Sequence, residues 1–253
     1  MRLVSEKTES TMFRLKLKPN QAAITLLAVL VLGTVILILN AESSHFITEV
    51  GHRTTSPVCP VKHERKEQVV NLAWLVSSEL TDLRVDHALC YDSLIGALKY
   101  GRLLPTQDHV DFCIMDTDYI RVFSMFTDKL SKSGLNFFYN SSHGEFIISR
   151  GRHSSSPDVA ITVFYICGRR HACRAGVARW LLSFFNGDSL DAFPRDLLKG
   201  PLKNLTFQGK PMPVPNGDAE ILKSFYPTDW WNKNIEHVCP NVTLLPLQPL
   251  PHN

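Results

Sequence analysis

The segment from Leu103 to Ile114 holds the densest group of side chains that could bind a metal ion. An apolar pair and a proline are followed by four such residues: Gln107, Asp108, His109 and Asp111. The chain then becomes apolar, as expected for a strand, and residues two apart at the start of a strand share a face. Asp111, His109 and Gln107 should therefore lie on one face, and Asp108 should point away. Oxygen ligands placed in this way can present Mg²⁺ or Mn²⁺ to a phosphate, so the segment is either a working metal site or the remains of one.

Length and composition limit the classes of protein that have to be considered. The chain has 253 residues, of which 44% are hydrophobic, and a formal net charge of +3. These values fit one globular domain with appendages, and the weak charge argues against a nucleic-acid partner. The densest basic cluster should be a solvated loop rather than a phosphate clamp. It consists of Arg169, Arg170, Arg174 and Arg179.

An apolar, uncharged run from Ala22 to Leu39 predicts a membrane-spanning helix, because a bilayer requires roughly 17 to 25 such residues. Basic residues precede the run and Glu42 follows it, which favours a cytosolic tail over residues 1–19 and a lumenal remainder. We therefore expect a single-pass type II signal-anchor over residues 20–40. The alternative is a cleaved signal peptide, whose apolar core is shorter, about 7 to 15 residues.

Cysteines and glycosylation sequons support a secretory location for the part of the chain after residue 40. All six cysteines and all three sequons lie there. The sequon asparagines are Asn140, Asn204 and Asn241. Cys167 and Cys173 are close enough to close a loop, Cys59 and Cys239 could tie the ends of the domain together, and Cys113 could be a buried thiol. Sequence alone does not choose among the possible pairings.

Hydrophobic periodicity predicts an α/β or mixed α+β domain. Apolar residues at helical spacing predict a helix over 62–83, and further helices are expected over 93–100, 118–134 and 219–225. The predicted strands cover 86–90, 110–115, 135–139, 145–149 and 159–166, and a hairpin is expected around Gln208-Gly209. This places a lumenal stem over residues 41–60, the domain over 61–232 and a Pro-rich tail over 233–253.

Three blocks of residues, between His87 and Trp230, resemble the fukutin branch of the LicD-type transferases, within the nucleotidyltransferase-fold superfamily. The first block is Tyr91–Lys99, and the second runs from Leu104-Pro105 through Val110-Asp111-Phe112 to Asp118-Tyr119. The third contains Phe193-Pro194, Phe207-Gln208-Gly209, Val214-Pro215, Glu220-Ile221-Leu222, Tyr226 and Trp230. The order and spacing of the three blocks carry the resemblance.

The resemblance implies a nucleotidyltransferase-like mixed sheet flanked by helices, in a Golgi or ER membrane protein with a lumenal domain. Enzymes of this kind move a phospho-alcohol, such as ribitol phosphate or phosphocholine, from a nucleotide-activated donor onto a glycan. The acceptor here would be a glycoprotein, and the reaction would need Mg²⁺ or Mn²⁺ to bridge the donor phosphates.

Only some of the family's catalytic residues have a matching residue in this chain. Asp111 matches the second aspartate of the metal-binding pair, and His109 stands where the first belongs. Asp92 replaces the glycine of the phosphate-binding turn, where it would either repel the donor or join Asp111 and His109 at the metal. Asp158, two residues before the aligned position Ala160, is the candidate for the third catalytic carboxylate.

Ser93, Gly96 and Lys99 match the donor-binding turn and helix of the family. Gly96 could instead serve only close packing, and Lys99 could be a solvated side chain. Two functions within the family remain open, and an unrelated secreted binding domain is a third alternative. One is a metal-dependent phospho-alcohol transferase, and the other is a catalytically inactive relative that binds or scaffolds other Golgi glycosylation enzymes.

Overall fold

The computed structural model of the protein describes residues 24, 26–33, 60–150, 158–176, 192–226 and 239. The chain divides into two units, residues 1–52 and 53–253. In the first unit, residues 26–33 form a short helix, and most of the predicted signal-anchor lies outside the described residues. Among the residues that are described, no helix is both long enough and apolar enough to span a bilayer. The predicted cytosolic tail and nearly all of the stem and of the Pro-rich tail also lie outside them, as do Cys59, Arg179, Trp230 and Asn241.

A seven-stranded mixed sheet forms the centre of the second unit, with the strand order β1-β2-β5-β4-β3 and with β6 and β7 continuing from β5. The strands are β1 (His87–Leu89), β2 (Val110–Met115), β3 (Leu135–Asn140), β4 (Glu145–Arg150), β5 (Val159–Cys167), β6 (His171–Arg174) and β7 (Ala192–Pro194). Only β2 and β5 pair in parallel, and all other pairs in this sheet are antiparallel. The predicted mixed α/β fold is therefore confirmed.

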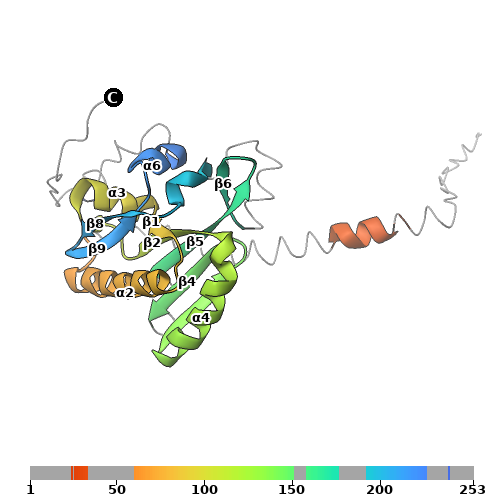
Figure 1. Cartoon of the computed structure of the whole chain (residues 1–253). Coiled ribbons are helices and arrows are strands. Elements are labelled where there is room, and N and C mark those ends of the chain that lie inside the picture. Colours follow the sequence, from red (N-terminus) through yellow and green to blue (C-terminus); the bar gives the residue numbers. More distant parts are fainter. Residues whose placement is uncertain are drawn as a thin grey trace, which may run out of the picture. The chain divides into compact units, whose positions relative to one another are not determined.

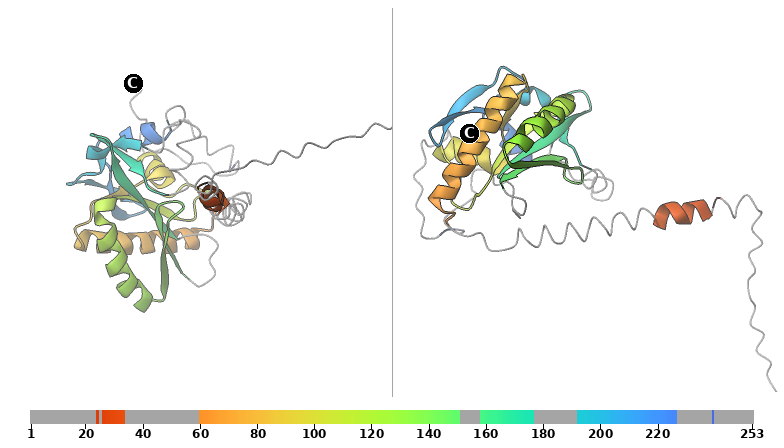
Figure 2. Two further views of the ribbon diagram at one scale, coloured as in Figure 1. Left: turned by 90° about the vertical axis from the view of Figure 1, so that its right-hand side faces the viewer. Right: turned by 90° about the horizontal axis from the view of Figure 1, so that it is seen from below.

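Helices cover both faces of this sheet. They are α2 (His63–Asp82), α3 (Tyr91–Tyr100), α4 (Tyr119–Lys132) and α6 (Glu220–Phe225), with short 3₁₀ helices at Asp116–Asp118 and Arg195–Leu198. Figures 1 and 2 show α2 and α4 on one side of the sheet and α3 and α6 on the other. The core lies between these layers and includes the fully buried rings of Phe112, Phe146 and Phe164.

Local sequence explains where the elements that position the site begin and end. Helix α3 ends at Gly101, which adopts the left-handed conformation (φ 61°) and donates its N–H to the carbonyl oxygen of Ala97. Strand β5 is buried from Val159 to Phe164, in agreement with the predicted central strand. The predicted hairpin is present as β8 (Lys203–Phe207) and β9 (Lys210–Val214), which form a separate two-stranded sheet.

The disulfides correct one prediction. Cys113 is not a free thiol, because it forms a disulfide with Cys90 just before α3. Sequence reasoning missed this pair because the two cysteines come together through the antiparallel pairing of β1 with β2, which places Cys90, directly after β1, beside β2. Cys167 and Cys173 form the loop-closing disulfide across the turn between β5 and β6. Cys239 is also disulfide-bonded.

Candidate functional site

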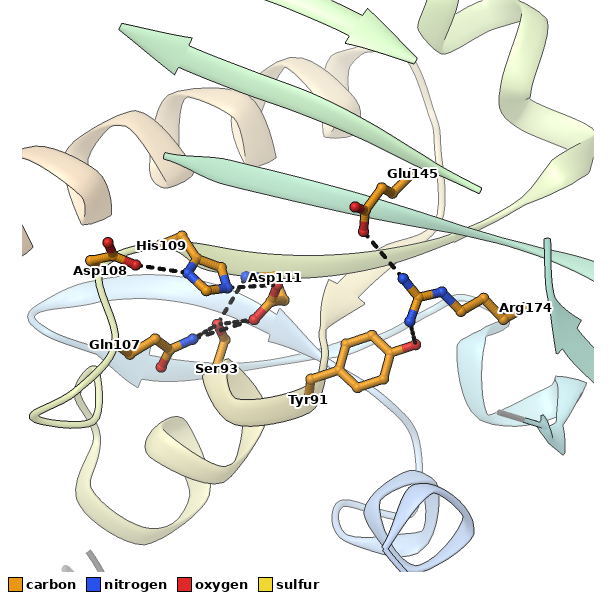
Figure 3. Close-up of polar contacts among 8 residues, drawn as sticks. All are labelled: Tyr91, Ser93, Gln107, Asp108, His109, Asp111, Glu145 and Arg174. Atoms are coloured by element: carbon orange, nitrogen blue, oxygen red, sulfur yellow. Dashed lines mark hydrogen bonds and ion pairs between the residues drawn. The ribbon is translucent and has the colours of Figure 1, made fainter. Parts of the chain in front are cut away.

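Ser93, in the first turn of α3, joins that helix to the start of β2. Its Oγ accepts hydrogen bonds from the backbone N–H of Asp111 (2.8 Å) and from Nε2 of Gln107 (2.6 Å). The same hydroxyl donates to Oδ2 of Asp111 (3.3 Å). One donated and two accepted bonds use the full capacity of a hydroxyl group. Ser93 is therefore the residue that fixes Asp111 against the helix (Figure 3).

Both carboxylate oxygens of Asp111 have partners within the protein. Oδ2 accepts from Ser93 and also from Nε2 of Gln107 (3.3 Å). Oδ1 lies 3.4 Å from Nε2 of His109. The side chain of Asp111 is only 12% exposed, so these contacts take the place of water. The expected grouping of Asp111, His109 and Gln107 is present in the structure.

Asp108 does not point away from this group as the alternation rule predicted. Its Oδ1 lies 3.0 Å from Nδ1 of His109, so the imidazole lies between two carboxylates. The prediction failed because β2 begins only at Val110. Residues before Val110 are not part of the strand, so their side chains need not alternate between its two faces. Burial alone would lower the pKa of His109, but the carboxylates of Asp111 and Asp108 outweigh it and raise that pKa to about 10.

The donor set of this site does not fit a divalent cation. Both ring nitrogens of His109 face carboxylate oxygens, Nδ1 that of Asp108 at 3.0 Å and Nε2 that of Asp111 at 3.4 Å, so in this arrangement the ring presents no lone pair to a metal. Across the described part of the chain, no three His, Cys, Asp or Glu side chains are grouped so that they could hold a metal ion.

Asp158, the candidate for the third catalytic carboxylate, forms its ion pairs with two arginine side chains. Its fully buried side chain forms ion pairs with Arg65 of α2 and Arg150 of β4. Its Oδ2 also accepts the backbone N–H of Arg150 (2.7 Å). The structure therefore gives Asp158 a structural role in joining α2 to the sheet. Asp92 lies half-buried in the first turn of α3, beside Ser93.

Two donor-site candidates on α3 are buried in the domain. A Cβ on Gly96 would clash with the carbonyl oxygen of Arg102, so this position needs glycine for close packing. Lys99 is buried, not solvated, and burial lowers its pKa. The third candidate, Ser93, contacts Asp111 directly.

A second polar cluster, formed by Tyr91, Glu145 and Arg174, was missed by sequence reasoning. Nη2 of Arg174 lies 3.2 Å from Oε2 of Glu145, and Nη1 lies 3.4 Å from the hydroxyl of Tyr91. Figure 3 shows this cluster beside the Asp111 group. Arg174 was expected to be solvated, yet its side chain is only 11% exposed.

The register of the sheet places Glu145 on the same face as Asp111. Glu145 pairs with Thr162, which in turn pairs with Cys113, two residues after Asp111. No local motif links Glu145 to Asp111, because they are 34 positions apart in the chain and meet only through β5. Local sequence patterns do not predict that β4 pairs with β5, and this pairing brings Glu145 to the face of Asp111.

Two sequon asparagines fall within the described residues. Asn140 ends β3, where its Oδ1 accepts from the backbone N–H groups of Ser142 (3.2 Å) and His143 (3.4 Å). Asn204 is exposed on β8. Glycosylation at either position stays a prediction.

The ion pairs of His109 predict a pH dependence of stability. Because its pKa rises from 6.5 to about 10 on folding, the stabilisation is complete below pH 6.5 and is lost as the pH rises through 10. The difference in unfolding free energy between the wild type and His109→Gln should therefore shrink between pH 6.5 and pH 10. Urea unfolding of both proteins at several pH values measures it, and a constant difference would contradict the assignment.

Comparison with known proteins identifies the domain that carries this site. The family model described as "LicD/FKTN/FKRP, nucleotidyltransferase domain" matches residues 84–217, which is more than half of the chain. No curated protein matches the chain. The matched segment contains α3, β2, β4, β5 and β6, and therefore both polar clusters. Such a domain indicates a transferase involved in phosphotransfer or glycan modification. The chain belongs to the LicD/FKTN/FKRP family of nucleotidyltransferase domains.

Proposed function

We propose that this chain is a fukutin-like, single-pass type II protein of the Golgi or ER membrane that takes part in glycoprotein glycan modification without catalysing the transfer itself. In this role its lumenal domain binds or scaffolds other Golgi glycosylation enzymes. The observation that carries the proposal is the position of His109 between Asp108 and Asp111. The membrane anchor, the location and the partners are inferred from the sequence.

Charge decides whether Asp111 can hold a metal ion. A metal-dependent transfer needs uncompensated carboxylates that hold a divalent cation beside the donor phosphates. Here one positive charge, the imidazolium of His109, already lies between the two carboxylates. A metal at Asp111 would first have to displace an ion pair. This arrangement supports a domain that keeps the fold and has lost the metal chemistry.

A second candidate function is a phospho-alcohol transferase of the ribitol-phosphate type. The observation that favours it is the retention of Asp111 at the start of β2, oriented by Ser93 and Gln107. In that case Asp111 would act with Mg²⁺ or Mn²⁺ on a nucleotide-activated donor, with a glycoprotein as acceptor.

A gain-of-binding experiment separates the two functions. We expect no thermal shift of the wild type with Mn²⁺ plus a cytidine diphosphate-linked donor. His109→Asp replaces the internal cation with a second carboxylate and should gain a shift, since a ligand at 100 times its Kd adds about 2.7 kcal/mol of stability.

Two variants serve as controls for this experiment. His109→Asn removes the imidazolium without adding a carboxylate, and Asp111→Asn in the His109→Asp background removes the remaining original ligand. Neither should show the shift. A metal-dependent shift of the wild type that Asp111→Asn abolishes would overturn the non-catalytic role and support the transferase.

A further inference from the structure

A cavity of about 430 Å³ lies apart from the Asp111 group, and none of the residues of that group line it. Its walls come from the C-terminal half of α2, from residues 84–87 and from the β8–β9 hairpin. Its volume falls within the roughly 300–1,000 Å³ of ordinary small-molecule sites. Neither the family match nor the proposed function assigns it a role.

The buried side of this cavity is polar but uncharged. Nδ1 of His87 lies 2.8 Å from the carbonyl oxygen of Val85, to which it can only donate, so Nε2 is left as an acceptor. The hydroxyl of Ser77, 2.7 Å from Nε2, therefore donates to it. Burial lowers the pKa of His87, which agrees with a neutral ring. A neutral pair of this kind is suited to an uncharged ligand.

The remaining lining also disfavours an anion. Two carboxylates, Asp82 and Asp86, accompany a single lining guanidinium, Arg84, so the lining offers a phosphate or nucleotide no excess of positive charge. The indole ring of Trp74 is 40% exposed, with the ammonium of Lys210 4.8 Å from its centroid, and its remaining surface lines the cavity together with the rings of Pro211 and Pro213. Apolar ring surfaces next to hydroxyl and carboxylate groups match a neutral sugar, which has both C–H faces and hydroxyl groups.

Asn204 connects this cavity to a specific sugar. In the hairpin, Asn204 pairs with Pro213 and Thr206 with Pro211, so these four residues share the face that includes the cavity wall. The opposite face carries the buried Phe207, Met212 and Val214. Asn204 is the acceptor residue of the sequon Asn204-Leu205-Thr206. A glycan attached to its side chain would therefore begin at the wall of the cavity.

We propose that this cavity seats the first N-acetylglucosamine of a glycan on Asn204, packed against Trp74 and hydrogen-bonded to the polar lining. This inference rests on the lumenal placement that is part of the proposed function. The sugar would fix α2 to the β8–β9 hairpin, so the modification would stabilise the domain, beyond adding solubility.

The test uses the full chain produced in a glycosylating secretory host, with site occupancy measured by mass spectrometry. Thr206→Ala removes the sequon but keeps Asn204, and Thr206→Ser keeps both. Thr206→Ala should lower the melting temperature by roughly 2–4 °C, the shift that loss of one sizeable contact gives a domain of this size. Trimming the glycan to a single sugar with an endoglycosidase should leave the melting temperature unchanged.

Trp74→Ala tests the contact itself. In that background Thr206→Ala should lower the melting temperature much less, because contacting groups are not additive. Ser142→Ala, which removes the sequon of Asn140, is the matched control, and its effect should not depend on Trp74. An occupied Asn204 with equal effects in both backgrounds would overturn the cavity assignment alone. If neither Asn204 nor Asn140 carries a glycan, the lumenal placement in the proposed function fails as well.

Discussion

Arg65→Met is expected to destabilise the domain by about 3 kcal/mol, the lower end of the cost of leaving a buried charge without its partner. Arg65 of α2 forms an ion pair with Oδ1 of Asp158, whose side chain is completely buried. That oxygen has no hydrogen-bond partner within the described residues, so Arg65 is its main compensation. The other oxygen keeps the backbone N–H of Arg150, which is why the cost should not reach the upper end of the range.

Two further variants make this prediction specific. Arg150→Ala removes only a guanidinium contact of 3.4 Å at a partly exposed side chain and should cost less than about 1 kcal/mol. Asp158→Asn in the Arg65→Met background removes the buried charge and should recover part of the loss. Urea unfolding measures all of these values. Equal losses for Arg65→Met and Arg150→Ala would contradict the assignment of Arg65 as the main partner of Asp158.

Asp158 also shows where reasoning from the sequence stops. The register of β2 and β5 pairs Asp111 with Ala160, and Asp158 lies two residues earlier, just before β5 begins. The expectation that it joins a catalytic group did not foresee Arg65, which lies on α2 far from β5 in the chain. Contacts between distant elements decide whether a buried carboxylate is available for chemistry. The periodicity of hydrophobic residues along the sequence does not predict such contacts.

Most of the elements were predictable because their signals are local, whereas the short strands β6 and β7 were not predicted. Apolar residues at helical spacing indicated α2, and Gly101 marked the end of α3. The dense β-branched run identified β5 as a buried strand. At the site, Asp111 and His109 were identified from spacing, but the imidazolium between Asp108 and Asp111 depends on backbone geometry before β2 that no pattern encodes.

The disulfide between Cys90 and Cys113 should contribute about 3 kcal/mol to stability, and Cys90→Ala/Cys113→Ala should lose at least that amount. The cysteines are 23 positions apart, and the chain-entropy cost of a loop of this length in the unfolded state gives this value. Both side chains are fully buried, so the cavity left by alanine adds to the loss. The pair closes the junction between α3 and β2 that Ser93 and Asp111 also form.

The matched control is the other disulfide described in the domain. Cys167 and Cys173 are only 6 positions apart, so Cys167→Ala/Cys173→Ala should lose about 2 kcal/mol. Urea unfolding of both double variants under oxidising conditions gives the comparison, and a larger loss for the 167–173 pair would contradict it.

Because the longer loop joins α3 to β2, removal of its disulfide should also weaken the contact between Ser93 and Asp111. The pH-dependent contribution of His109 would then be smaller in Cys90→Ala/Cys113→Ala than in the control, which links the disulfide to the geometry of the site.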